Sequence, residues 1–382
     1  MPEKQPPITV LMTVYNGLPY LPEAIKSVVD QTFRHFEFLI IDDASSDDSV
    51  NCIKSFHDYR IRLVCNEENM GQAFSLNKGL KLSRGKYIAR LDQDDVCLPK
   101  RLEEQFGFLE ENPQVAAACT WEDAVDSFGQ KVRHWRRKFH NFGEFLGLLL
   151  VAKCPIWHPS VMFRRLVIDE LGGYDESLAP AEAFDWWARI AMHRFEGAII
   201  PKTLVLQRVH NKRQSVSKAK EQWQNMRHAH DRLVQSFCPS LYADRLARFL
   251  RLPTDAVTSI VPEQELFWGK YHDQEDIRLS LLALDELLHK VKIDLNLSSD
   301  ELASLSRLLI KRLGFGVGIR RFLVRLPRLL FYPIFYVLSP MLSPNISRAL
   351  SYCNDASKEL RYPLRSFQAR LREKRSLKES SH

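Results

Sequence analysis

The chain has 382 residues, which is enough for one complete α/β domain and a second unit. Its hydrophobic content of 45% and charged content of 26% are ordinary for a globular protein, and its formal net charge is +7. This modest charge argues against a protein that binds nucleic acid along its whole length. The seven cysteines show neither a CxxC pair nor zinc-ligand spacing, which fits a reducing cytosol. The polar N-terminal residues predict that there is no signal peptide.

The first part of the chain alternates between short apolar runs and amphipathic segments, a pattern typical of an α/β fold with a parallel sheet. The predicted strands are residues 8–13, 36–41, 61–65 and 87–91. The predicted helices are residues 22–31, a segment after 47, residues 72–82 and a segment that begins near 99.

The strand at 87–91 leads directly into Asp92, Asp94 and Asp95. Ligands of open α/β sheets bind just beyond the carboxyl ends of such strands. Carboxylates this close repel one another unless a cation lies among them, and oxygen-only ligands favour Mg²⁺ or Mn²⁺. The alternative is an acidic turn that caps the helix beginning near Pro99, with Asp95 or a neighbour as a solvated cap.

Polar residues also follow the first two predicted strands. Tyr15 and Asn16 come after the first strand, and Asp42 and Asp43 come at the end of the second. We therefore expect these residues to converge with the three aspartates at one edge of the sheet. The chain has no GxGxxG or GxxxxGK[ST] motif after any strand, which argues against a dinucleotide-binding fold and against a P-loop.

Four segments in this order, ITVLMTVYNG, LIIDDASSDDS, NEENMGQAFSLNKGL and RGKYIARLDQDD, resemble glycosyltransferase family 2. The resemblance covers residues 8–95 and continues more loosely to about residue 220, through HPSVMFRR, LGGYDE, AEAFDWWARI and QRVHNKRQSVS. It implies the α/β GT-A fold of nucleotide-diphospho-sugar transferases, with a mostly parallel mixed sheet flanked by helices. It also implies an inverting enzyme that moves a sugar from a nucleoside-diphosphate sugar, with a UDP-sugar favoured, to an acceptor hydroxyl.

The resemblance further implies which residues form the site. It assigns nucleotide-sugar binding to Thr13, Tyr15, Asn16, Asp43, Asn69, Gly71, Asn77, Arg90, Asp92 and Arg208. It assigns a divalent cation, Mn²⁺ or Mg²⁺, to Asp94 and His210. Ordinary turn or helix chemistry is the alternative for Asn16, Asn69, Gly71 and Asn77.

The segment that supplies the general base departs from the family pattern in this chain. The acceptor hydroxyl must lose a proton as it attacks, and a carboxylate is the usual acceptor of that proton. The family places an Asp where this chain has Ala183. Glu182 and Asp185 flank the position, and we favour Glu182 because Asp185 can serve as a helix cap. A protein that binds a sugar nucleotide but has lost the activity is the alternative, and a nucleotidyltransferase is a third possibility.

The second part of the first 217 residues is predicted to bind the acceptor. Residues 142–152 are predicted to form a helix, and residues 156–163 and 203–209 to form strands. Trp186 and Trp187 either stack on an acceptor sugar or lie in the core. Residues 131–138, KVRHWRRK, are both basic and aromatic, and we expect a hairpin strand or loop that forms a solvated edge or a phosphate contact.

The expected organisation is a transferase domain at 1–217, with a donor half at 8–120 and an acceptor half at 121–217. A helical extension at 218–318 follows, with helices at 221–237, 262–272, 276–291 and 300–313.

Residues 319–347 are first arginine-rich and then apolar. The uncharged run of 14 residues is too short to span a bilayer, which needs about 20. We expect this segment to lie in a membrane interface, and a buried or oligomeric hairpin is the alternative. The basic tail at 348–382 would add attraction to anionic lipid. The predicted protein is therefore cytoplasmic and peripheral at the cytosolic face of the membrane, builds a surface polysaccharide or a lipid-linked glycan, and does not bind nucleic acid.

Overall fold

The computed structural model describes residues 5–211, 213, 217–238, 243–250 and 274–312. The chain divides into two compact units, Met1–Phe315 and Gly316–His382, and all described residues belong to the first. The predicted helix at 262–272, the predicted interface segment at 319–347 and the basic tail lie outside the described residues.

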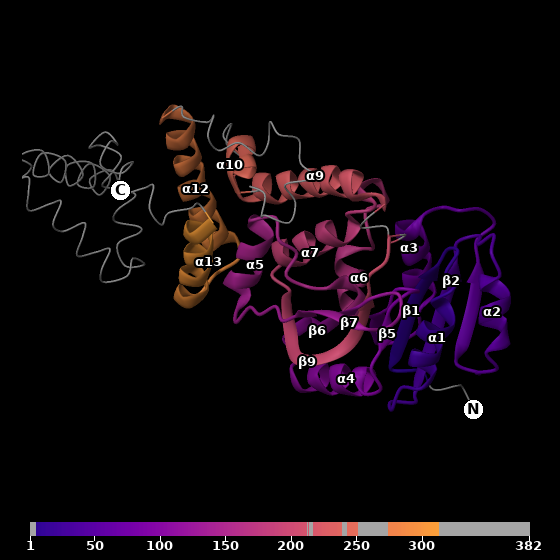
Figure 1. The fold of residues 1–382 in the computed structure, drawn as a ribbon. Helices are drawn as coiled ribbons and strands as arrows, with labels where there is room; N and C mark the ends of the chain where they lie inside the picture. Colours follow the sequence, from indigo (N-terminus) through magenta and orange to yellow (C-terminus); the bar gives the residue numbers. More distant parts are fainter. Residues whose placement is uncertain (1–4, 212, 214–216, 239–242, 251–273, 313–382) are drawn as a thin grey trace, which may run out of the picture. The chain divides into compact units, whose positions relative to one another are not determined.

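A mixed sheet forms the centre of the first unit, and in the described residues it has nine strands (Figure 1). Their order is β3-β2-β1-β4-β8-β6-β9-β5, with β7 paired to β6. The strands are β1 Ile8–Val14, β2 Phe36–Asp42, β3 Ile61–Cys65, β4 Tyr87–Arg90, β5 Val96–Cys97, β6 Val115–Val125, β7 Lys131–Trp135, β8 Met162–Arg164 and β9 Glu196–Arg208.

The sheet is parallel through β3, β2, β1 and β4. β8 then runs antiparallel to both β4 and β6, whereas β9 runs parallel to β6. The carboxyl ends of β1, β2 and β4 therefore lie at one edge of the sheet, as the sequence predicts. The long strand β9 follows β6 over most of its length (Figure 1).

Helices cover both faces of this sheet, because alternate residues along each strand point to opposite faces. Val10 and Met12 of β1 belong to a core with α1, α2 and α4, whereas Leu11 belongs to a second core with α3, α5, α7 and the helices that follow. The described α-helices are α1 Leu21–Val29, α2 Ser49–Ser55, α3 Gln72–Leu82, α4 Arg101–Glu111, α5 Phe142–Leu150, α6 Arg165–Leu171, α7 Glu182–Met192, α9 Ala219–Phe237, α10 Ala243–Leu250, α12 Gln274–Asp294 and α13 Ser299–Arg312. No helix among the described residues has the length and apolarity to cross a bilayer.

Most predicted elements are present, and the differences have physical reasons. The predicted strand at 156–163 is wrong: a 3-10 turn at His158–Ser160, which contains a proline without an N–H, leaves only the short strand β8. β6 is absent from the predicted elements because its sequence, VAAACTWEDAV, combines alanines with carboxylates, and both have low strand propensity. Pairing with β8 and β9 overrides this local preference.

Candidate active site

Three carboxylates gather where the chain leaves β4. One oxygen from each of Asp92, Asp94 and Asp95 lies within 4.8 Å of the others. Asp95 is fully buried, whereas Asp92 and Asp94 are half-buried. α4 follows from Lys100 without a side-chain cap, so the alternative of an acidic helix cap is wrong.

The surroundings of Asp92 and Asp95 disfavour the negative charge of these two carboxylates. Burial raises the pKa of Asp92, and the neighbouring Asp94 raises it further while Arg90 opposes the shift. The pKa of Asp95 is raised well above its usual value, first by burial and then by Asp94 and Asp92. One oxygen of Asp95, Oδ2, is buried and accepts no hydrogen bond from the described residues. A divalent cation would satisfy this oxygen and offset the repulsion, so the residues present fit a metal with oxygen ligands.

His210 lies beside this cluster, just after the end of β9. Its Nε2 is 2.8 Å from Oδ2 of Asp94, and its ring packs against Tyr20 at a centroid separation of 4.9 Å. The sequence prediction paired Asp94 with His210 as metal ligands, and the fold brings the two side chains together from positions 116 residues apart. Imidazole nitrogen is a common ligand of transition metals, so this position is compatible with that role.

Arg208 is almost fully buried and contacts several elements at once. Its backbone N–H donates to Asp95 Oδ1 at 2.9 Å, and its Nε donates to the carbonyl of Asp94 at 3.2 Å. The guanidinium also donates to Glu23 of α1 at 2.5 Å and to the carbonyl of Asp126 at 3.2 Å. These contacts fix the loop after β4 against α1, so the arginine holds the carboxylate cluster in place.

A cavity of about 610 Å³ opens next to Asp94 and His210. Its lining comes from the loops after β1, β4, β6 and β9, and consists of Tyr15, Asn16, Gly17, Leu18, Pro19, Tyr20, Gln93, Asp94, Asp126, Ser127, Val209, His210 and Asn211. The sequence analysis did not identify Tyr20, Gln93 or Asp126. Gln93 bonds both backbone groups of Tyr15, at 2.9 and 3.2 Å, and so joins the loops after β1 and β4.

Asp43 and Asn16 organise the loops around this cavity. Asp43 is buried, and it accepts hydrogen bonds from the Asn66 side chain at 2.6 Å and from the backbone N–H of Gly71 at 2.8 Å. Gly71 has a φ of +90°, which a side chain would strain. The side-chain oxygen of Asn16 accepts from the backbone N–H of Ser46 at 2.8 Å. Asp43 thus shapes the loop that the sequence assigned to donor binding.

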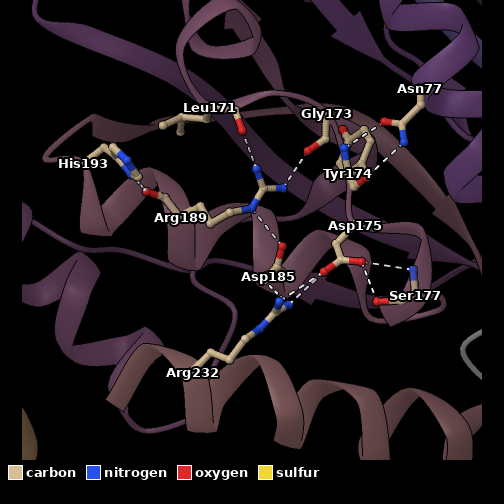
Figure 2. A network of polar contacts seen from close by, with 10 residues as sticks. All are labelled: Asn77, Leu171, Gly173, Tyr174, Asp175, Ser177, Asp185, Arg189, His193 and Arg232. Carbon is tan, nitrogen blue, oxygen red and sulfur yellow. Dashed lines mark hydrogen bonds and ion pairs between the residues drawn. The ribbon is translucent and has the colours of Figure 1, made fainter. Parts of the chain in front are cut away.

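The remaining donor-site candidates lie in varied surroundings. Thr13 is half-buried near the end of β1, and Asn69 is exposed in the loop before α3. Asn77 does not line the cavity: it donates to the carbonyl of Tyr174 at 2.9 Å and accepts from the N–H of the same residue at 2.8 Å (Figure 2). Arg90 is buried, with Nη2 at 2.7 Å from Asp92 Oδ1.

The two candidate bases on α7 have different surroundings. Glu182 is buried, and its Oε2 has no hydrogen-bond partner in the described part of the chain. Burial raises the pKa of Glu182, and Asp92 raises it while Arg90 lowers it. Glu182 is therefore electrostatically coupled to the carboxylate cluster and has a free oxygen.

Asp185 instead belongs to a network of arginines (Figure 2). Arg189 donates to its Oδ2 at 2.9 Å, and Arg232 of α9 donates to its Oδ1 at 2.8 Å. Arg189 also donates to the carbonyls of Leu171 and Gly173, at 2.8 and 2.6 Å. Both oxygens of Asp185 are therefore occupied, and the network joins α7 to α9 and to the loop after α6.

Trp186 and Trp187 are completely buried. Trp186 packs edge-on against Phe163, at a centroid separation of 4.7 Å. Stacking of either ring on an acceptor sugar is therefore wrong, and both rings belong to the core.

Sequence reasoning missed Glu122 on β6. This side chain is completely buried, and neither carboxylate oxygen makes a hydrogen bond of good geometry with a described residue. Burial raises its pKa to about 7; the neighbouring Ser160 hydroxyl opposes the shift, and Asp92 adds to it. The signal in the sequence is a glutamate in the segment VAAACTWEDAV, which is mostly apolar but also contains Thr120 and Asp123.

Comparisons with known proteins agree with this geometry. The chain matches the family model "Glycosyl transferase family 2" over residues 9–171. It is 31% identical to an uncharacterized glycosyltransferase of Methanocaldococcus jannaschii, MJ1057, over 62% of this chain and 84% of the relative. It is 30% identical to EpsE of Bacillus subtilis, also named as a glycosyltransferase, over 52% of this chain and 72% of that protein.

A solved structure supports the fold independently. The crystal structure of S. aureus TarS, residues 1–349, matches with a TM-score of 0.51 and 14% identity, and the match covers 80% of this chain and 88% of that one. The predicted GT-A fold is confirmed by this similarity. From the extent of its similarity to MJ1057, together with the family match, the chain belongs to glycosyltransferase family 2 and is a transferase.

Proposed function

We propose that this glycosyltransferase transfers a sugar from a nucleoside-diphosphate donor to an acceptor hydroxyl with inversion of configuration at the anomeric carbon. The observation that carries the proposal is the group of three carboxylates within 4.8 Å, one of which lines a cavity of about 610 Å³. A divalent cation held there would stabilise the charge of the departing diphosphate. Asp94 and His210 are the proposed ligands, since they face each other at 2.8 Å. Both Mn²⁺ and Mg²⁺ suit the carboxylates, and the imidazole favours Mn²⁺.

In this proposal the nucleotide of the donor binds in the cavity next to Asp94. Tyr15 and Asn16 line the cavity and would contact the nucleotide together with Asp92 and Thr13. Asp43 would act on the donor through the loop that it shapes at Asn69 and Gly71, because its own oxygens are engaged by protein groups. Arg90, Arg208 and Asn77 would hold the surrounding elements rather than the nucleotide, because each already bonds protein groups. UDP is the favoured nucleotide.

Glu182 is the proposed general base. A base needs an oxygen that is free to accept a proton, and a pKa raised toward neutrality makes it more effective. Glu182 meets both conditions, whereas both oxygens of Asp185 accept from arginines. This difference favours an active enzyme over the alternative in which Ala183 marks a lost activity.

The acceptor and the place of action are inferred from composition. The arginine-rich and apolar segment at 319–347 supports attachment at the cytosolic face of a membrane, where the acceptor would be a surface polysaccharide or a lipid-linked glycan. That segment lies outside the described residues, so its interface role remains a prediction.

The proposal is tested by measuring donor cleavage and thermal stability with UDP-, GDP- and dTDP-sugars, each with and without Mn²⁺. We expect one nucleotide to stabilise the protein in a metal-dependent manner, by about 2.7 kcal/mol at a ligand concentration of one hundred times Kd. Asp94→Asn should abolish the metal-dependent part. Asp169→Asn, at an exposed carboxylate of α6, is the matched control and should leave it intact. If no sugar nucleotide binds, or if Asp94→Asn binds metal and donor normally, the proposed site is wrong.

A further inference from the structure

The hairpin formed by β6 and β7 presents apolar side chains to solvent. Phe128 in its turn is 86% exposed, and Val132 on β7 is 58% exposed. Within the described sheet β7 pairs only with β6, so its other edge is open. A phenylalanine exposed to this degree at the tip of an ordered turn contributes nothing to the packing of this unit.

The turn holds Phe128 in this position through a compact set of bonds. Oδ1 of Asp126 accepts from the backbone N–H groups of Phe128 and Gln130, each at 2.9 Å. Gly129 adopts a φ of +81°, and its N–H donates to the carbonyl of Asp126 at 3.1 Å. These hydrogen bonds therefore hold the turn in a defined conformation before any partner binds.

Basic side chains continue from this tip along β7 and through the residues just after it. Three of them, Lys131, His134 and Arg136, pair with the buried Asp123 at 3.1, 2.9 and 2.7 Å. These contacts help to lower the pKa of Asp123 to about 2 despite its burial, so it stays ionised and offsets one positive charge.

Three further cations lie over aromatic rings instead of carboxylates. Arg133 lies over Trp135 at 4.9 Å from its centroid, Arg137 over Trp157 at 4.3 Å, and Lys138 over Trp121 at 6.0 Å. No carboxylate of the described residues pairs with these three side chains within 4 Å. The hairpin therefore carries both a net positive charge and exposed apolar residues.

We propose that this surface, defined by Phe128, Val132, Arg133 and Lys138, docks the catalytic unit on a bilayer that contains anionic lipid. Basic residues on the same hairpin as an exposed aromatic tip match the charged headgroups and the apolar layer beneath them. The basic residues could instead serve only to protect the open edge of β7 from pairing with another strand. That role does not explain an exposed phenylalanine at the tip. An acidic glycan would match the cations but not an exposed Phe128 and Val132.

The turn of this hairpin lies at the cavity, so docking of the hairpin would place the cavity near the bilayer. Asp126 and Ser127, at the base of the turn, line the same cavity as Asp94 and His210. Contact of the tip with a bilayer would bring the cavity close to the headgroups, where a lipid-linked acceptor presents its reactive end. The inference rests on the proposed attachment to a membrane and assigns part of it to the catalytic unit.

The test is cosedimentation of the full chain with phosphatidylcholine vesicles that do or do not contain phosphatidylglycerol, without donor or metal. We expect binding that requires the anionic lipid and weakens with salt. Phe128→Ser should reduce the affinity roughly tenfold, because the ring would no longer enter the interface. Arg133→Glu with Lys138→Glu should reduce it by more than about tenfold, because each basic residue contributes roughly fivefold.

Matched controls are Tyr59→Ser, at a tyrosine that is 93% exposed, and Lys54→Glu with Lys81→Glu, at exposed lysines of α2 and α3. These variants should bind as the parent does. Equal binding by the hairpin variants and the parent would overturn the proposal, since another segment would then carry all attachment. Loss of binding to dextran sulfate, but not to vesicles, in the charge variant would also overturn it in favour of an anionic glycan. Donor-induced thermal stabilisation is measured separately, so failure of the transferase proposal is distinguishable.

Discussion

Glu182 and Asp185 are three residues apart on α7, yet the fold gives them different chemistry. Glu182 faces the side of the helix where Arg90 and Asp92 act on it, and one of its oxygens is unpartnered in the described residues. Asp185 faces Arg189 and Arg232, which occupy both of its oxygens (Figure 2). A carboxylate is a useful base only if its lone pairs are available, so residue identity alone does not separate the two.

Substitution of Glu182 should therefore affect mainly turnover, whereas substitution of Asp185 should affect mainly stability. Glu182→Gln should lower kcat at least about a hundredfold while nucleotide binding persists, because an amide cannot take the proton. Asp185→Asn should retain most of the turnover but lose about 2 kcal/mol of unfolding free energy, because the hydrogen bonds that the buried Asp185 accepts from Arg189 and Arg232 are weakened. Steady-state kinetics and urea unfolding of both variants check this. Ala183→Asp placed in the Glu182→Gln background should restore part of kcat. Full activity of Glu182→Gln would exclude Glu182 as the base.

Glu122 should make stability depend on pH. Burial raises its pKa from 4.5 to about 7 in the folded protein, so the folded state holds a proton that the unfolded chain releases. Its contribution is fully present below about pH 4.5 and is lost as pH rises through about 7. Glu122→Gln should therefore gain on the order of 3 kcal/mol over the parent between pH 5 and 8, measured by urea unfolding at each pH. A constant difference between the two proteins across this range would contradict the prediction.

At the scale of elements, an irregular strand pairing shapes the sheet and a close helix contact shapes the helical layer. The pairing of β6 with β9 is irregular on both sides of Trp121, and such bulges redirect the side chains that follow. Glu122 is the first residue after this irregularity. In the helical layer, α5 lies against α13 so closely that a Cβ on Gly143 would clash with the backbone carbonyl of Glu301.

Gly143→Ala should therefore separate α13 from α5. Backbone cannot move aside as a flexible side chain can, so we expect a loss of about 1 to 3 kcal/mol in unfolding free energy. Gly107→Ala in α4 is the matched control, because a Cβ there meets nothing within 4 Å. It should be neutral or stabilise by up to about 1 kcal/mol. Equal effects of the two substitutions on the urea midpoint would show that the close contact with α13 has no energetic weight.

At the scale of the molecule, the site is assembled from segments that are far apart in the chain. Arg208 contacts Glu23 across 185 residues and Asp94 across 114. The mixed order of the sheet produces this, because β9 pairs with β5, the short strand that directly follows the three aspartates. The carboxylates are thereby held together in a poorly hydrated place that raises the pKa values of Asp92 and Asp95.

Binding of a divalent cation should therefore release protons. Asp92 and Asp95 have raised pKa values in the metal-free protein, so they hold protons at a higher pH than ordinary aspartates, and a cation must displace them. Affinity for Mn²⁺ should rise with pH, by up to about tenfold per unit for each proton displaced. Calorimetric titration in two buffers with different ionisation enthalpies measures the protons released. A binding enthalpy that is independent of the buffer would show that the carboxylates are already ionised.

The sequence by itself determined the parallel half of the sheet and the place of the three clustered carboxylates. Continuous apolar runs can only be buried strands here, and acids at their ends must lie at one edge of a parallel sheet. Tyr15, Asn16 and Asp94 line the cavity as this reasoning predicts, beside His210, which the family resemblance supplied. Only the tertiary structure showed that Asp43 and Asp185 are engaged by protein groups, that Glu182 keeps a free oxygen and that Glu122 is buried. The reason is physical: which lone pairs are free, and which charges lose their water, depends on neighbours that the chain brings from more than a hundred residues away.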